Sequence, residues 1–214
     1  MGTRPPTRRF VRWLGAIALV AAAHSISTDP ALAGEPGDAK RMEVGLAPLD
    51  LFTGPWHLRQ HHFNEAGDAI ATVKGTEEIV WVLNGRAIRR TYTAISEPAN
   101  FRAVGMLTWN VADGEYEGVW FDNVSTNGPT TVTATWNDDQ RTLLATLRSR
   151  AADESPLEFK VLERFTDADH RVATTYRIRG SETIKLLEVE YTRAAPCPDR
   201  LRIIYDRGVE YQGQ

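Results

Sequence analysis

A run of aromatic residues interspersed with glycines, from Ala103 to Phe121, constrains the fold of this chain more than any other feature. It reads AVGMLTWNVADGEYEGVWF. If residues 111–114 form the tip of a β-hairpin, each large side chain on one face lies opposite a glycine or another ring. Glycine leaves room for the ring opposite, which suits the concave inside of a curved sheet, and the pattern therefore predicts a barrel. The predicted pairs on this face are Trp109–Tyr116, Leu107–Gly118 and Gly105–Trp120.

Two further hairpins extend the antiparallel pattern. Asn84-Gly85 is the strongest short hairpin signal in the chain, since a type I′ turn needs positive φ at both central residues. It predicts the inward-facing pairs Trp81–Ile88, Ile79–Arg90 and Glu77–Tyr92. A turn at residues 137–140 joins two strands with an apolar face and a Thr-rich face, which is the clearest division between inside and outside. The apolar face carries Val132, Ala134, Trp136, Leu143, Ala145 and Leu147.

The remaining strands are predicted from shorter alternations. Trp56, Leu58, Gln60 and His62 share one face of a strand over 56–63. Further strands follow at 157–165, at 172–178 with Val172, Thr174, Tyr176 and Ile178 on one side, and at 183–193. Short turns join nearly all of the strands, and no helical period is long enough for a crossover helix. The sequence predicts an all-β fold of about ten antiparallel strands, and short links favour an up-and-down barrel over an immunoglobulin-like sandwich.

The N-terminus has the features of an export signal. Four arginines precede an apolar run at 13–23, and Ala31-Leu32-Ala33 is a small-x-small cleavage pattern. The apolar run is about half the length that a bilayer span requires. We expect a signal peptide over 1–33, cleavage after Ala33, and a periplasmic or secreted protein with no membrane span. Arg8-Arg9-Phe10 is similar to a twin-arginine signal shifted by one residue, so both export routes stay open.

The mature chain is predicted to contain one domain. A polar linker at 34–45 precedes the barrel at 46–193, and a tail follows at 194–214. Loss of residues 1–33 removes four Arg and one Asp, which leaves 21 basic and 27 acidic residues and a net charge of −6. An acidic exported chain is a poor candidate for nucleic-acid binding. Cys197 is the single cysteine, so no intramolecular disulfide and no thiolate metal cluster can form.

Several short motifs resemble those of a known family. They include Gly54-Pro55-Trp56, the block from Trp81 to Arg86 with Tyr92, and the block from Tyr116 to Asp122. Together with Gly105 and Ser125 they resemble a bacterial family of exported calycin-like barrels, catalogued as the domain of unknown function number fifteen-seventy-nine. The resemblance covers about Leu46 to Arg193 and implies a lipocalin-like barrel. It implies no chemistry, so no catalytic residue is carried over.

The predicted inner face supplies a candidate ligand site. Rings provide contact area for an apolar molecule, while a few polar groups fix its orientation. We expect Arg90 and Tyr92 to orient a small apolar or amphipathic ligand and tryptophans to line the lumen. The same residues also fit a filled core with an internal salt link. The candidates are Glu77, Trp81, Arg90, Tyr92, Trp109, Tyr116, Trp120 and Asp122.

No metal or cofactor is expected. His57 and His61 share a face but lie four residues apart on an extended strand, which separates them by roughly 13 Å. The acidic pairs Asp138-Asp139 and Asp167/Asp169 lack the glycine and distal glutamate of a calcium loop. Nitrobindin-like barrels bind haem through a histidine, whereas the C-terminal half of this chain offers only His170, in a turn.

Three functions stay open on the sequence alone. The first is a non-enzymatic exported barrel that binds a small, partly apolar molecule in its lumen. The second is an enzyme acting in the same cavity, although the chain has no Gly-x-Ser-x-Gly elbow, no His-Glu-x-x-His and no phosphate loop. An acid–base pair such as Glu77 with Asp122 has no supporting motif. The third is an interaction module that uses the outer residues Val80, Val82, Val104, Met106 and Phe121.

Overall fold

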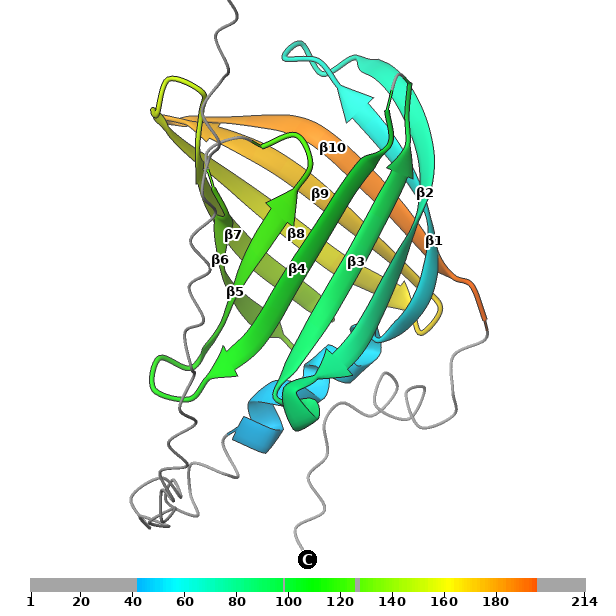
Figure 1. The fold of residues 1–214 in the computed structure, drawn as a ribbon, viewed down its shortest axis with the longest axis vertical. Helices are drawn as coiled ribbons and strands as arrows, with labels where there is room; N and C mark the ends of the chain where they lie inside the picture. The colour runs from blue at the N-terminus through cyan, green and yellow to red at the C-terminus, as the bar shows by residue number, and fades with distance from the viewer. Residues whose placement is uncertain (1–41, 98, 126–127, 196–214) are drawn as a thin grey trace, which may run out of the picture. The chain divides into compact units, whose positions relative to one another are not determined.

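The predicted strands close into one ten-stranded barrel in the computed structural model of the chain (Figure 1). The structure describes residues 42–97, 99–125 and 128–195. Strands follow one another around the barrel in sequence order, and β10 pairs back onto β1, so every neighbouring pair is antiparallel. The strands are β1 (Gly54–Phe63), β2 (Ala69–Val82), β3 (Ala87–Ile95), β4 (Phe101–Asn110), β5 (Glu115–Asp122), β6 (Thr130–Asn137), β7 (Thr142–Arg150), β8 (Pro156–Asp167), β9 (His170–Arg179) and β10 (Glu182–Arg193). This confirms the all-β, up-and-down, lipocalin-like fold.

The hairpin registers match those predicted from the turns. Across β4 and β5, Trp109 lies opposite Tyr116, Leu107 opposite Gly118 and Gly105 opposite Trp120. The register predicted for β2 with β3 is confirmed as well. The predicted division of β6 and β7 into an apolar face and a Thr-rich face also holds, but the turn lies at 138–141, one residue later than predicted, because Asn137 pairs with Thr142. Asn84 and Gly85 have φ of 56° and 80°, and the N–H of Arg86 donates to the Leu83 carbonyl at 3.3 Å, as in a type I′ turn. Turn chemistry thus sets the register of the neighbouring strands.

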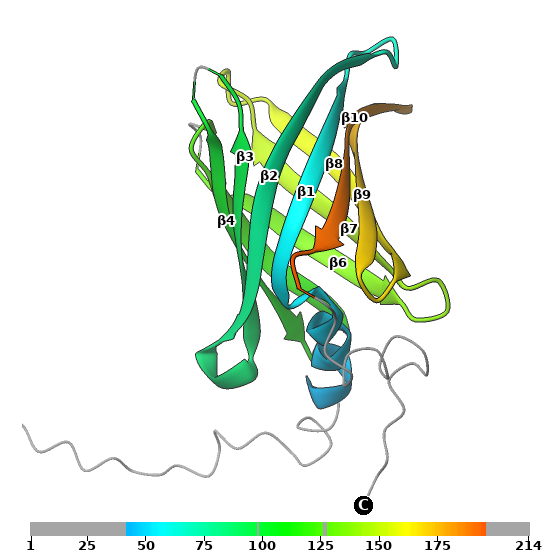
Figure 2. The same ribbon diagram turned by 90° about the vertical axis from the view of Figure 1, so that its right-hand side faces the viewer.

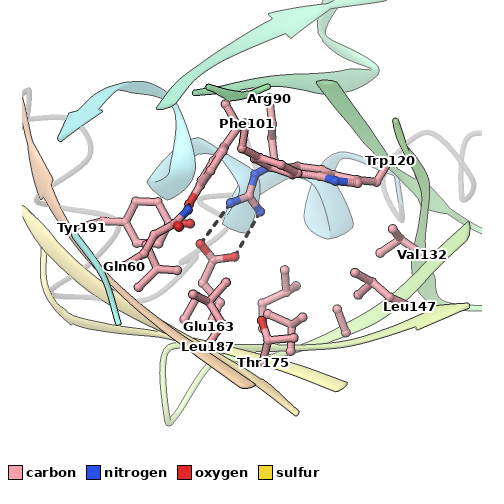
Figure 3. A pocket seen from close by; sticks show the side chains of 16 residues that line it. Gln60, Arg90, Phe101, Trp120, Val132, Leu147, Glu163, Thr175, Leu187 and Tyr191 are labelled. Carbon is pink, nitrogen blue, oxygen red and sulfur yellow. Dashed lines mark hydrogen bonds and ion pairs between the residues drawn. The ribbon is translucent and has the colours of Figure 1, made fainter. Parts of the chain in front are cut away.

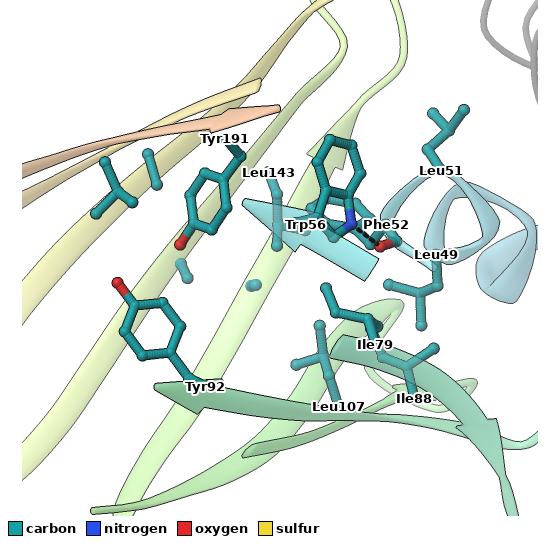
Figure 4. Packing of buried hydrophobic residues seen from close by; sticks show 14 of the residues in the cluster. Leu49, Leu51, Phe52, Trp56, Ile79, Ile88, Tyr92, Leu107, Leu143 and Tyr191 are labelled. Carbon is teal, nitrogen blue, oxygen red and sulfur yellow. Dashed lines mark hydrogen bonds between the residues drawn. The ribbon is translucent and has the colours of Figure 1, made fainter. Parts of the chain in front are cut away.

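A short helical segment closes one end of the barrel (Figure 2). A helical turn at 42–46 leads into the 3-10 helix η2 (Ala47–Phe52), whose apolar side chains are buried. Phe52 packs edge-on against Phe165 of β8, with ring centroids 4.9 Å apart. The Trp56 indole N–H donates to the Phe52 carbonyl at 2.8 Å (Figure 4). The tryptophan of the Gly-Pro-Trp motif thereby fastens η2 to the start of β1.

An arginine at the end of the last strand holds the same closed end. The Arg193 guanidinium donates from Nη2 to the Leu51 carbonyl at 2.6 Å and from Nε to the Ala168 carbonyl at 3.0 Å. These carbonyls lie at the end of η2 and in the β8–β9 turn, where strand pairing does not satisfy them. Residues 1–33, predicted to be the signal peptide, and residues 196–214 of the predicted tail lie outside the described residues.

One strand faces the other way from its predicted alternation. Val172, Thr174, Tyr176 and Ile178 were predicted to share one side of β9, but the other side faces inward: Ala173 and Thr175 line the lumen and Arg171 is fully buried. An inward arginine is tolerated because two carboxylates meet it in the barrel.

Among the described residues, no helix is long and apolar enough to cross a membrane.

Candidate functional site

A cavity of about 260 Å³ lies inside the barrel (Figure 3). Its wall is mainly apolar, with side chains contributed by strands around the circumference. Six of these side chains are Phe101, Trp120, Val132, Leu147, Val161 and Leu187. The polar groups are few, namely Gln60, Arg90, Tyr92, Glu163, Thr175 and Tyr191. A concave apolar pocket with a few converging polar groups is the usual form of a small-molecule site.

Two arginines and two glutamates form a charged cluster at the cavity. Arg90 donates from Nε to Oε1 of Glu77 at 2.7 Å and from Nη1 to Oε2 of Glu163 at 3.1 Å. Its Nη2 donates to both carboxylates, at 3.2 and 3.3 Å. Arg171 forms ion pairs with the same two glutamates. Arg90 and Glu163 line the cavity, whereas Glu77 and Arg171 are buried away from it.

Aromatic rings surround the buried arginine of this cluster. The Arg171 guanidinium carbon lies 3.9 Å from the ring centroid of Tyr191 and 4.6 Å from that of Trp56. Stacking on aromatic faces stabilises a desolvated guanidinium. The cluster therefore separates the cavity from the aromatic packing of the closed end, which contains Trp56 and Phe52 (Figure 4).

Ion pairing determines the charge state of Glu77. Burial alone would raise the pKa of this carboxyl group, but the charges of Arg90 and Arg171 and their hydrogen bonds outweigh burial and hold the pKa below its usual value. Glu77 is therefore ionised at neutral pH. A carboxylate held in this state by two arginines is a weak general base.

A chain of hydrogen bonds runs along one side of the cavity. His62 shares a 2.8 Å hydrogen bond with Oε1 of Gln60, and Nε2 of Gln60 donates to the Tyr92 hydroxyl. The hydroxyls of Tyr92 and Tyr191 point toward each other (Figure 4). Burial raises the pKa of Tyr92 to about 12, and it raises the pKa of Tyr191 well above the ordinary value. Both phenols are therefore protonated at neutral pH.

A second hollow adjoins the cavity on the side away from η2. It has a volume of about 390 Å³ and shares Gln60, Phe101 and Leu187 with the cavity. Its other lining residues include His62 and Ile70, which lie near the β1–β2 turn. Burial lowers the pKa of His62, so this ring is neutral at pH 7. The three shared side chains form the border between the hollow and the cavity.

The structure brings only some of the predicted site residues together. Arg90, Tyr92 and Trp120 line the cavity. Glu77 lies outside the cavity wall and accepts a hydrogen bond from Arg90. Asp122 accepts hydrogen bonds from the backbone N–H groups of Val124 and Ser125 and from the Ser125 hydroxyl. Asp122 thus shapes the β5–β6 loop and is not part of the cavity wall.

Three other predicted residues lie at the closed end. Trp81 donates to the Asp50 carboxylate at 2.7 Å, and the Tyr116 hydroxyl donates to the Gly45 carbonyl at 2.6 Å. Trp109 packs against Tyr116, with ring centroids 4.9 Å apart. These three side chains do point inward, but they bind the N-terminal helical segment and do not face the cavity.

Four residues of the site were not among the candidates. Glu163 stands at alternate positions with Val161 and Phe165 in β8, so strand alternation is the signal that could have placed it inward. Gln60 shares a face with Trp56 and Leu58 in the same way. Tyr191 and Arg171 had no comparable signal.

Within the described residues, no three His, Cys, Asp or Glu side chains are arranged to hold a metal ion.

Comparisons with known proteins place the fold in context. The sequence profile of one family matches residues 47–193, and the family carries the description "Protein of unknown function (DUF1579)". No curated protein matches the chain. A solved structure of an S-type phycobiliprotein lyase from Guillardia theta aligns with 74% of this chain and 98% of its own, at 13% identity and a TM-score of 0.49. A redesigned β-barrel aligns with 71% of this chain and 96% of its own, at 10% identity and a TM-score of 0.35.

Proposed function

This chain belongs to DUF1579, a family of proteins of unknown function, so we propose a function from its cavity alone. The barrel binds one small, largely apolar molecule in its lumen, with Arg90 and Tyr92 beside the polar end of that molecule. The observation that carries this proposal is the apolar cavity of about 260 Å³, which lies next to the ion pairs of Arg90 with Glu77 and Glu163.

The size of the cavity limits the ligand. An apolar cavity of about 150 Å³ holds one benzene molecule. A volume of about 260 Å³ therefore accommodates a body the size of two fused rings or a short hydrocarbon chain. A core that was merely filled would have few voids larger than a water molecule.

The geometry favours binding over catalysis. Both carboxylates of the charged cluster are held by arginines, and Asp122 is engaged in its own loop. An acid–base pair of Glu77 with Asp122, for which the sequence has no supporting motif, therefore has neither partner free for proton transfer. The exposed side chains of Val104 and Phe121 lie on the outer face, away from this site.

The proposed setting is outside the cytoplasm. The basic and apolar start of the chain and the Ala31-Leu32-Ala33 pattern support export and a mature N-terminus at Gly34. N-terminal sequencing of the protein from fractionated cells tests this proposal. A chain that keeps Met1 in the cytoplasmic fraction would contradict it.

Calorimetry with naphthalene as the probe tests binding. We expect one saturable site, and we expect Ala145→Phe to abolish it, because Ala145 lines the cavity and a phenyl ring there occupies much of its volume. Leu144→Phe is the matched control, since Leu144 is exposed on the outer face. Native mass spectrometry of the protein purified from its own compartment should show a copurifying small molecule in the wild type that Ala145→Phe lacks. Equal naphthalene binding by both variants would refute a site in the lumen.

A further inference from the structure

The hydrogen bonds already made at the cavity determine what a ligand's polar end can be. Arg90 carries five N–H donors and no acceptor. Its Nε, Nη1 and Nη2 make four hydrogen bonds to Glu77 and Glu163. One N–H of Arg90, on Nη1, is left over for a molecule in the cavity.

Gln60 is oriented by its neighbours so that it adds a second donor. Its Oε1 can only accept, so the neutral His62 ring must donate through Nε2. The amide nitrogen of Gln60 faces Tyr92 and donates one of its two N–H groups to the hydroxyl. The second N–H of this nitrogen is available, and Gln60 lines the cavity.

The two tyrosines contribute a third donor. The Tyr92 and Tyr191 hydroxyls face each other, and both residues line the cavity. Two such hydroxyls use only one proton between them, so one phenolic proton remains. Both phenols keep their protons at neutral pH, since burial raises the pKa of each.

The acceptors at the cavity are largely occupied. Oε1 of Glu163 meets both guanidinium groups, and Oε2 accepts from Arg90. Oε1 of Gln60 is bonded to His62, and the hydroxyl of Thr175, which also lines the cavity, can either donate or accept. The site thus has an excess of donors, which suits a ligand group that accepts hydrogen bonds.

The charge balance of the cluster bears on whether that group is ionised. Two arginines and two glutamates sum to zero, and all four are paired with one another. A carboxylate or ammonium entering the cavity would lose its hydration without gaining an unpaired counter-charge. Among the described residues, those that line the cavity include no charged side chain other than Arg90 and Glu163.

We propose that the ligand carries a neutral hydrogen-bond acceptor, such as the carbonyl of a ketone, ester or amide, on an apolar body of about two-ring size. This inference rests on the proposed function, since it describes the occupant of the same cavity. The carbonyl oxygen lies among Arg90, Gln60 and Tyr92, and the apolar body lies against Trp120 and the aliphatic wall.

A series of naphthalenes that differ only in one substituent tests the inference. Calorimetry at pH 7 compares 2-acetylnaphthalene with 2-isopropylnaphthalene, which has the same shape, and with 2-naphthoate and 2-(aminomethyl)naphthalene, which are an anion and a cation. One or two net hydrogen bonds correspond to about a tenfold gain in affinity. We expect the ketone to bind about tenfold more tightly than the isopropyl compound and at least tenfold more tightly than either ion.

Two variants connect the preference to the donors. Tyr92→Phe and Gln60→Leu should each reduce the advantage of the ketone over the isopropyl compound by at least threefold, measured as the ratio of the two affinities within the same variant, so that a general change in the cavity cancels. Tyr176→Phe is the control, because Tyr176 alternates with the cavity residue Thr175 and lies on the outer face of β9. This control should keep the full tenfold advantage.

The outcomes separate the two proposals. If naphthalene itself does not bind, the proposed function fails. If naphthalene binds but the ketone has no advantage, or if an ion binds as tightly as the ketone, lumen binding stands and the neutral-acceptor inference is overturned. Retention of the ketone's advantage in both Tyr92→Phe and Gln60→Leu also overturns it.

Discussion

Removal of one charge from the buried cluster should strongly destabilise the barrel. Glu77 is 1% exposed and Arg171 is 0% exposed, and Glu77 is paired with both arginines. Glu77→Gln preserves the shape of the side chain but leaves two guanidinium charges against one carboxylate. Breaking a buried ion pair by removal of one partner costs about 3–5 kcal/mol. With a urea m-value of about 2 kcal/mol/M, the denaturation midpoint should fall by about 2 M.

A double-mutant cycle separates charge balance from packing. Arg171→Met keeps an apolar, flexible side chain among the rings of Trp56 and Tyr191, and on its own it leaves two carboxylates against one guanidinium. In the double variant Glu77→Gln/Arg171→Met, the pair of Arg90 with Glu163 is balanced again. We therefore expect the double variant to be more stable than either single variant.

Urea denaturation followed by circular dichroism gives the three free energies of unfolding. A coupling free energy of about 2 kcal/mol or more between the two substitutions is expected. If Glu77→Gln costs less than about 1 kcal/mol, the carboxylate is not a desolvated partner of two arginines. If the two costs simply add, charge balance is not what stabilises the cluster, and the reasoning is refuted.

Three further predictions concern pH, packing and a turn. The folded-state pKa of Glu77 lies below its usual value of 4.5, so the contribution of Glu77 to the free energy of unfolding is fully present above pH 4.5 and is lost as the pH falls through the folded-state pKa. The free energy of unfolding should therefore fall less steeply with acid in Glu77→Gln than in the wild type. An identical slope would count against the low pKa of Glu77. A Cβ at Gly105 would lie 2.7 Å from Cε3 of Trp120, so Gly105→Ala should displace that ring, change its fluorescence and weaken naphthalene binding, and unchanged binding would mean that Trp120 does not shape the site. Leu83 is 67% exposed with φ of 52°, so Leu83→Asn should raise the free energy of unfolding by about 0.5–1 kcal/mol, and a lower melting temperature would contradict the strain.

The strand registers could be predicted from the sequence because they depend on local chemistry. Asn84-Gly85 and the hairpin tip at 111–114 each specify a pairing, and alternation then assigns every side chain to one face. The same alternation brought Glu77, Arg90 and Tyr92 inward together. Fold class followed from these local features and from the shortness of the links.

Position along the barrel axis could not be predicted in this way. Trp81, Trp109 and Tyr116 point inward as expected, but they pack on the N-terminal helical segment, whereas Trp120 lines the cavity. Height depends on strand tilt and on the closure of β10 onto β1, which pairs segments from opposite ends of the domain. No short motif contains that information.

The inward arginine of β9 was missed for an energetic reason. A charged residue beside Val172 is ordinarily assigned to solvent, because an unpaired buried charge is very costly. Arg171 is buried because Glu77 and Glu163, which lie 94 and 8 residues away in sequence, converge on it. Its environment exists only once the barrel has closed.

Nuclear Overhauser effects between naphthalene and the methyl groups of the protein test the central claim of a ligand site in the lumen most directly. We expect cross-peaks from the naphthalene protons to methyl groups of Val132, Leu147 and Val161, which line the cavity. Methyl groups of Val104 and Leu144, which are exposed on the outer face, should show none. Cross-peaks confined to Val104 or Leu144, or no saturable cross-peaks to the cavity methyl groups, would contradict the account.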